Sequence, residues 1–132
     1  MGSYRSKYVI LDTNMILSIF EQSIDLKNSI LDLIGKCEIV VPRTVLKELY
    51  LLSVHGKGKR KINAQSAIDY VERNFDIIEN EGDTDTSLIS LAKQLKAVVA
   101  TNDRELRKKL RENSIPVLFL RERKKLVSDG TI

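Results

Sequence analysis

Short apolar runs recur along the chain, and the first of them, Tyr8–Leu11, is apolar at every position. An unbroken run of this kind is typical of a strand covered on both faces, whereas strict alternation indicates a strand with one wet face. Later runs predict four more strands, and the last of these is expected to turn back as a short hairpin. The predicted strands are Tyr8–Leu11, Glu38–Val41, Phe75–Ile78, Ala97–Thr101 and Pro116–Leu120, with the hairpin formed by Arg121–Lys125 and ending near Val127.

Between these runs, apolar residues recur at intervals of three and four, the spacing of a helix with one buried face. The segment His55–Lys61 interrupts this spacing with two glycines and four basic residues, so it is predicted to be a flexible loop. The predicted helices are Met15–Phe20 with a cap near Thr13 or Asn14, Asp25–Gly35, Pro42–Ser53, Asn63–Asn74, one capped by Asp83 or Thr84, and a basic helix from Asp103 to about Glu112.

Strands that alternate with helices predict parallel strands joined by right-handed crossovers. The sequence shows no internal repeat and no interdomain linker. Residues 1–132 are therefore expected to form a single three-layer α/β/α domain around a central, mainly parallel sheet, with enough chain for one real core.

Composition narrows the class of protein. Apolar residues at 42% and charged residues at 30% fit a folded chain. The net charge of +4 is mild, so affinity for nucleic acid depends on where the basic residues lie. Cys37, the sole cysteine, excludes an internal disulfide, favours a cytoplasmic location and is expected to be a small buried hydrophobe. No apolar run approaches the ~20 residues of a membrane span and no signal peptide precedes the first strand, so no membrane association is expected.

Four acidic residues are expected at one edge of the sheet. Asp12 and Asp103 follow two predicted strands, and Asp85 lies in the first turn of the helix after a third. Parallel strands place their carboxyl ends, and commonly their ligands, at the same edge. Glu48 shares a helical face with apolar neighbours, an unusual place for a charge. Each of the four acids taken alone could simply cap a helix or reach solvent. For a fifth acid, Asp83, a helix cap is the favoured interpretation.

Carboxylates that lie close together repel, and one or more must take up a proton unless a cation intervenes. No Lys or His adjoins all four acids in the sequence pattern, so a divalent cation is expected. Oxygen ligands suit Mg²⁺ or Mn²⁺, whereas His55 stands alone and does not favour zinc. Such sites perform phosphoryl chemistry, in which the metal activates a water and stabilises charge on the phosphate.

The chain resembles the PIN-domain nucleases. The similarity rests on four segments in the family's order that together extend over nearly the whole chain. They are Val9–Asn14, Pro42–Leu49, Asp85–Ala92 and Val99–Leu106, of which the first and last are the most specific. The resemblance implies that Asp12, Glu48, Asp85 and Asp103 are the catalytic, metal-binding acids, with Asn14, Thr101 and Asn102 as polar supports.

The same resemblance implies metal-dependent endonucleolytic cleavage of single-stranded or structured RNA. One branch of the family is the VapC-type toxin, which works with an antitoxin. The other is the ribosomal-RNA-processing nuclease, in which a ribosome-assembly partner is expected and to which Ile115–Arg121 is similar. A homodimer is compatible with either branch.

Basic residues gather in three segments around the expected acidic edge, which fits an anionic substrate whose scissile phosphate needs metal. Arg121–Lys125 forms one of these segments. The residues predicted to bind RNA are Lys57, Lys59, Arg60 and Lys61 in the glycine loop and Arg104, Arg107 and Lys108 in the helix after Asp103. A solvated charged face is the alternative for that helix. Aromatic residues are few, so base stacking is expected to be minor.

Three other functions start from similar features. A haloacid-dehalogenase-type phosphatase needs a second acid two residues after Asp12, where this chain has Asn14. A receiver-type phosphoacceptor needs an acidic pair near the first strand, and none is present. The third is a catalytically silent RNA-binding or assembly module on the same fold, which an assay with and without Mn²⁺ separates from an enzyme.

Overall fold

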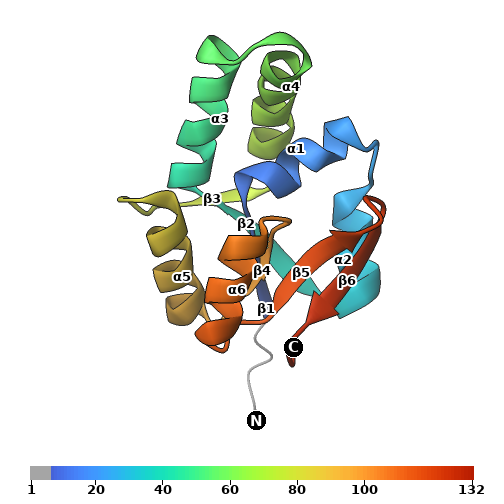
Figure 1. The fold of residues 1–132 in the computed structure, drawn as a ribbon, viewed down its shortest axis with the longest axis vertical. Helices are drawn as coiled ribbons and strands as arrows, with labels where there is room; N and C mark the ends of the chain where they lie inside the picture. The colour runs from blue at the N-terminus through green and yellow to red at the C-terminus, as the bar shows by residue number, and fades with distance from the viewer. Residues whose placement is uncertain (1–6) are drawn as a thin grey trace.

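The computed structural model describes residues 7–132, and its centre is a six-stranded sheet in the order β3-β2-β1-β4-β5-β6 (Figure 1). The first five strands are mutually parallel and β6 runs antiparallel to β5, which confirms a mainly parallel sheet and the terminal hairpin. The strands are β1 (Lys7–Leu11), β2 (Cys37–Pro42), β3 (Asp76–Ile78), β4 (Val98–Ala100), β5 (Val117–Arg121) and β6 (Lys125–Asp129).

Helices cover both faces of the sheet, which confirms the three-layer α/β/α arrangement. In Figure 1, α6 lies in front of the strands with α5 to its left, and α2 lies behind them, while α3 and α4 stand side by side beyond one edge of the sheet. The helices are α1 (Thr13–Glu21), α2 (Leu26–Ile34), α3 (Arg43–His55), α4 (Gly58–Asn74), α5 (Thr84–Leu95) and α6 (Arg104–Glu112).

The central strands explain the unbroken apolar runs. Val9, Ile10 and Leu11 of β1 are fully buried, because β1 pairs with β2 on one side and β4 on the other while helices cover both faces. The β4 residues Val98–Ala100 are buried in the same way. These strands form a rigid base from which the next residues of each segment project at the carboxyl edge.

The predicted flexible loop at His55–Lys61 is wrong. Only Gly56 and Lys57 separate α3 from α4, and α4 begins at Gly58 rather than at Asn63. Lys59, Arg60 and Lys61 thus form the first turn of a helix. Glycines beside a run of charges resemble a loop in sequence, but packing of α4 along α3 stabilises the helix beyond what local propensity predicts.

Smaller corrections concern the ends of elements. The cap of α1 is Asp12 rather than Thr13 or Asn14, and Pro42 is the residue before α3 rather than within its first turn. Phe75 ends α4 instead of opening β3. Cys37 is only half-buried at the start of β2, because it sits at the rim of the core and not within it. Within residues 7–132, no helix is both long and apolar enough to cross a membrane.

Candidate active site

The carboxyl ends of β1 and β4 place two of the predicted acids together. Leu11 pairs with Ala100, and the Asp12 N–H donates to the Ala100 carbonyl at 3.2 Å, so the pairing continues one residue past β1. Asp103 follows β4 after two residues and caps α6. Both acids therefore lie at the same edge, as the parallel topology predicts.

Asp12 is held by two donors that fix both carboxylate oxygens. Its Oδ1 accepts the Met15 N–H at 2.8 Å, and its Oδ2 accepts a short hydrogen bond from the Thr101 hydroxyl. The Asp12 side chain is only 5% exposed. The carboxylate that caps α1 is therefore also the one that faces the site, and the two interpretations of Asp12 are compatible.

Thr101 links Asp12 to Asp103. The buried Thr101 Oγ1 accepts the Asp103 N–H at 3.1 Å while its hydroxyl proton goes to Asp12. Asp103 Oδ1 in turn accepts the N–H groups of Glu105 and Leu106 at 2.9 and 3.2 Å. The expected supporting role of Thr101 thus has a specific geometry, since one hydroxyl fixes the relative position of two acids.

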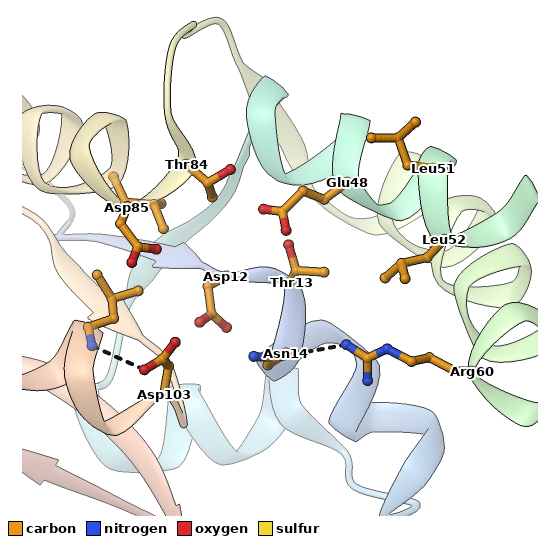
Figure 2. A pocket seen from close by; sticks show the side chains of 12 residues that line it. Asp12, Thr13, Asn14, Glu48, Leu51, Leu52, Arg60, Thr84, Asp85 and Asp103 are labelled. Atoms are coloured by element: carbon orange, nitrogen blue, oxygen red, sulfur yellow. Dashed lines mark hydrogen bonds between the residues drawn. The ribbon is translucent and has the colours of Figure 1, made fainter. Parts of the chain in front are cut away.

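The four predicted acids line one pocket of about 420 Å³. They come from four different segments: Asp12 from the end of β1, Glu48 from α3, Asp85 from the first turn of α5 and Asp103 from the end of the β4 segment. Figure 2 shows their carboxylates projecting into a common space. The sequence pattern was therefore correct in bringing these residues together.

Burial and the charges of neighbouring acids raise the pKa of two of these residues, Asp12 and Asp85. Desolvation raises the pKa of Asp12 to about 7, and the charges of Asp103 and Glu48 add to the increase against the opposing hydrogen bonds. Partial burial, followed by the charge of Asp103, also raises the pKa of Asp85. Both shifts show that negative charge is costly in this pocket, which favours a cation there.

Thr13, predicted only as a possible helix cap, supplies a further oxygen to the acid pocket. The residue is 7% exposed, and within residues 7–132 its buried Oγ1 has no hydrogen-bond partner. In Figure 2 the hydroxyl points toward Glu48. An orphaned buried hydroxyl is costly unless something binds it.

The oxygen-only donor set fits a hard divalent cation such as Mg²⁺ or Mn²⁺. Within residues 7–132, however, no three His, Cys, Asp or Glu side chains already converge closely enough to bind one ion. The acids therefore line a pocket as separate groups. Carboxylates of like charge repel one another, and a bound cation would offset that repulsion.

Arg60, one of the residues predicted to bind RNA, lies beside the acids. Its Nη2 donates to Asn14 Oδ1 at 3.2 Å, and Arg60 lines the acid pocket (Figure 2). This contact is possible because Arg60 lies in the first turn of α4, which stands beside α1. Asn14, predicted as a polar support, thus lines the pocket, and Arg60 lies beside the acids and not on a separate loop.

The remaining predicted residues lie outside the acid pocket. Asn102 Oδ1 accepts the Leu120 N–H at 2.8 Å, so Asn102 joins the β4 segment to β5 in a neighbouring groove. Arg107 lies half-buried with its guanidinium 4.0 Å from the centre of the Phe119 ring, which makes it a packing residue of α6 in this structure. The side chains of Lys57, Lys59, Arg104 and Lys108 are exposed, and that of Lys61 is half-buried.

Asp83 caps α5, as the sequence favoured. Its Oδ2 accepts the Thr86 N–H at 3.3 Å. Asp83 lines a separate pocket that contains none of the four acids. It therefore provides a natural control for substitutions at the site.

The three-layer α/β/α fold of this chain, which carries acids at the carboxyl ends of β1 and β4, is shared with a solved PIN-domain structure. The structure is similar to that of the PIN domain endonuclease Utp24. The TM-score is 0.77 at 23% identity, and the match covers 95% of this chain and 92% of the other. A second similar structure, "A domain of a functionally unknown protein" from Methanocaldococcus jannaschii, gives a TM-score of 0.61 at 18% identity over 96% of both chains. At these identities the likeness concerns the fold.

Sequence similarity identifies the family to which the chain belongs. The family model described as "PIN like domain" matches residues 9–123, and the chain belongs to this family. "Ribonuclease VapC9" of Archaeoglobus fulgidus is 30% identical over 117 residues, which cover 89% of this chain and 85% of that protein. "Ribonuclease VapC4" of Methanocaldococcus jannaschii is 32% identical over 121 residues, which cover 88% and 92%. The resemblance to PIN-domain nucleases is confirmed.

Proposed function

We propose that the protein is a metal-dependent endoribonuclease whose catalytic acids are Asp12, Glu48, Asp85 and Asp103. The observation that carries the proposal is the convergence of these acids, from four separate segments, on one pocket. Two relatives named as ribonucleases that match most of the chain support RNA as the substrate.

The four acids and the Thr13 hydroxyl would hold Mg²⁺ or Mn²⁺. When bound, the ion supplies charge neutralisation for the scissile phosphate and lowers the pKa of a water. Buried Asp12 must give up its proton for metal to bind, and the Thr101 hydroxyl favours the charged form by donating to Oδ2. Thr101 thereby keeps both Asp12 and Asp103 in position.

Arg60 is placed to meet the substrate. It adjoins the acids, yet among residues 7–132 it makes no ion pair and donates its hydrogen bond to the neutral Asn14. A guanidinium presents several donors in a fixed plane and binds phosphate oxygens well. We assign Arg60 to a phosphate of the bound RNA, with Lys57, Lys59, Lys61, Arg104 and Lys108 as outlying contacts that attract the strand.

The VapC-type branch is the one we favour, because both sequence relatives carry that name. An antitoxin partner is then part of the proposal, as is a homodimer. Co-expression with the product of a neighbouring small gene, followed by co-purification, tests the partner. The alternative of a silent RNA-binding module on the same fold predicts RNA binding without cleavage.

Cleavage of single-stranded RNA with chelator, Mg²⁺ or Mn²⁺ tests the activity. We expect cleavage only with metal, and a decrease of roughly 10²-fold in Asp103→Asn, the effect of losing one electrostatic stabiliser. Asn is a good helix cap, so α6 should remain folded. The matched control Asp83→Asn removes a capping acid outside the pocket and should retain activity. Full activity of Asp103→Asn, or cleavage that is indifferent to chelator, contradicts the proposal.

A further inference from the structure

A second groove adjoins the acid pocket on the side of α1 and the β5–β6 turn. It measures about 360 Å³, and it shares Asn14 and Asp103 with the acid pocket as a common wall. A volume of this size lies within the range of about 300–1,000 Å³ typical of small-molecule sites. The groove is therefore adjacent to the acids and large enough to hold one nucleotide base.

The lining of the groove suits a nucleobase. Gln22 and Asn102 contribute carboxamides, Glu21 contributes a carboxylate and Leu120 an apolar, half-buried surface. Carboxamides carry a donor and an acceptor side by side, as the edges of bases do. A base that is splayed out of a single strand can be read by such groups while its face packs on an apolar side chain.

Asn102 is already oriented for this purpose. Its Oδ1 is engaged by the Leu120 N–H at 2.8 Å, which leaves the Nδ2 amide as the group that can donate into the groove. The predicted support role of Asn102 is thus connected to the groove and not to the acids. Because Asn102 also joins two strands, its substitution would disturb the fold, and Gln22 is the better probe.

The charged residues around the groove indicate where the phosphates and the base of a bound strand would lie. Arg123, in the turn between β5 and β6, lines the groove, while Arg60 lines the acid pocket on the other side of Asn14. Glu21 disfavours a phosphate deep in the groove but can accept from a base amino group. Phosphates are therefore expected near the two arginines, with a base between them.

We propose that this groove, lined by Gln22, Asn102 and Leu120 and ending at Arg123, binds the base of a nucleotide next to the scissile phosphate, with Arg123 on the following phosphate. The inference rests on the proposed ribonuclease activity and adds the subsite that positions the RNA strand.

Kinetics with two variants tests the subsite. Gln22→Ala and Arg123→Gln should each raise KM for a single-stranded RNA about tenfold, a loss of about 1.4 kcal/mol of binding, while kcat changes far less. Gln94→Ala on α5 and Lys36→Gln, which precedes β2 at the opposite edge of the sheet, are the matched controls and should behave as wild type. A purely structural effect would instead lower the melting temperature and reduce kcat as well.

Modified substrates locate the base. RNA with an abasic ribose on one side of the cleavage site should show the tenfold higher KM with wild type, and Gln22→Ala should no longer distinguish abasic from intact RNA. The proposal is rejected if abasic substitutions on either side of the cleavage site give the same KM. It is also rejected if Gln22→Ala and Arg123→Gln both have the wild-type KM.

A binding measurement separates this inference from the proposed activity. Asp85→Asn removes an acid that does not line the groove and serves as a cleavage-deficient background. In that background, Arg123→Gln should weaken RNA binding and make the log-affinity against log-salt slope shallower by ~0.7. An unchanged slope rejects the role of Arg123. Wild-type protein that binds RNA with this pattern but never cleaves it rejects the proposed activity and leaves the subsite standing.

Discussion

At the scale of single residues, Asp12 shows that a helix cap and a site acid can be the same group. One oxygen satisfies the Met15 N–H at the start of α1, and the other accepts from Thr101 at the pocket. The sequence presents these as alternatives, because cap preference and site chemistry select the same residue types. The structure removes the conflict, since a carboxylate has enough lone pairs for both.

Thr13 offers a residue-scale prediction. Thr13→Val keeps the shape and removes a buried hydroxyl that has no hydrogen-bond partner among the residues that the structure describes. Stability should stay the same or rise by up to about 1 kcal/mol, because an unsatisfied group is lost. RNA cleavage and Mn²⁺ affinity should nevertheless fall, each about tenfold, if the hydroxyl serves the bound ion.

Thr13→Ser is the control, as it retains the oxygen at the same position, and it should keep most of the activity. Calorimetric titration of Mn²⁺ and urea unfolding provide the two measurements. A Val variant with wild-type metal affinity would show that Thr13 only shapes the wall of the pocket.

At the scale of elements, the corner between α3 and α4 determines where Arg60 lies. Gly56 ends α3, and a Cβ added there would come within 2.4 Å of the Leu52 carbonyl oxygen, a backbone atom that cannot move freely. The short connection therefore depends on the absence of a side chain at this position. It sets the start of α4 and, through it, the contact between Arg60 and Asn14.

Gly56→Ala should destabilise the protein by about 1–3 kcal/mol, the usual cost of forcing atoms into a filled space. It should also raise KM for RNA, because Arg60 moves with α4. Gly58→Asn is the control: nothing lies within 4 Å of an added Cβ there, and Asn tolerates the positive φ of 59°. Chemical denaturation of both variants gives the comparison, and equal midpoints would refute this account of the corner.

At the scale of the whole molecule, the acid pocket couples folding to pH and to metal. Because the pKa of Asp12 is raised from 3.8 to about 7, the folded state holds a proton that the unfolded state has already released in this range. Stability must therefore fall as pH rises from about 4 through about 7, and then level off. The raised pKa of Asp85 acts in the same direction.

We expect metal-free protein to lose about 2–3 kcal/mol between pH 5 and pH 8 from Asp12 alone. Asp12→Asn should remove this part of the slope and be more stable than wild type at pH 8 in chelator. Mn²⁺ should stabilise wild type at pH 8, since it binds the folded state, and should do so much less at pH 5. Urea unfolding at both pH values provides the test, and parallel pH profiles for wild type and Asp12→Asn would contradict it.

Much of the architecture was predictable because it depends on local patterns. Unbroken apolar runs identified β1 and β4, and helical spacing identified α2 and α5 within a residue or two. The errors occurred where packing overrides local preference. Residues 58–61 look like a loop in sequence, yet they form the start of α4 because that helix lies along α3.

The sequence by itself determined the parallel sheet and the common edge of Asp12, Asp85 and Asp103, since strand direction decides the edge at which residues after a strand must lie. Only the tertiary structure decided which other side chains share that space. Thr13 and Arg60 reach the pocket because α1 and α4 stand beside it, whereas Arg107, in an equally basic run, turns to pack on Phe119. Sequence spacing gives the face of a helix, but neighbouring elements decide whether that face meets the site, the core or water.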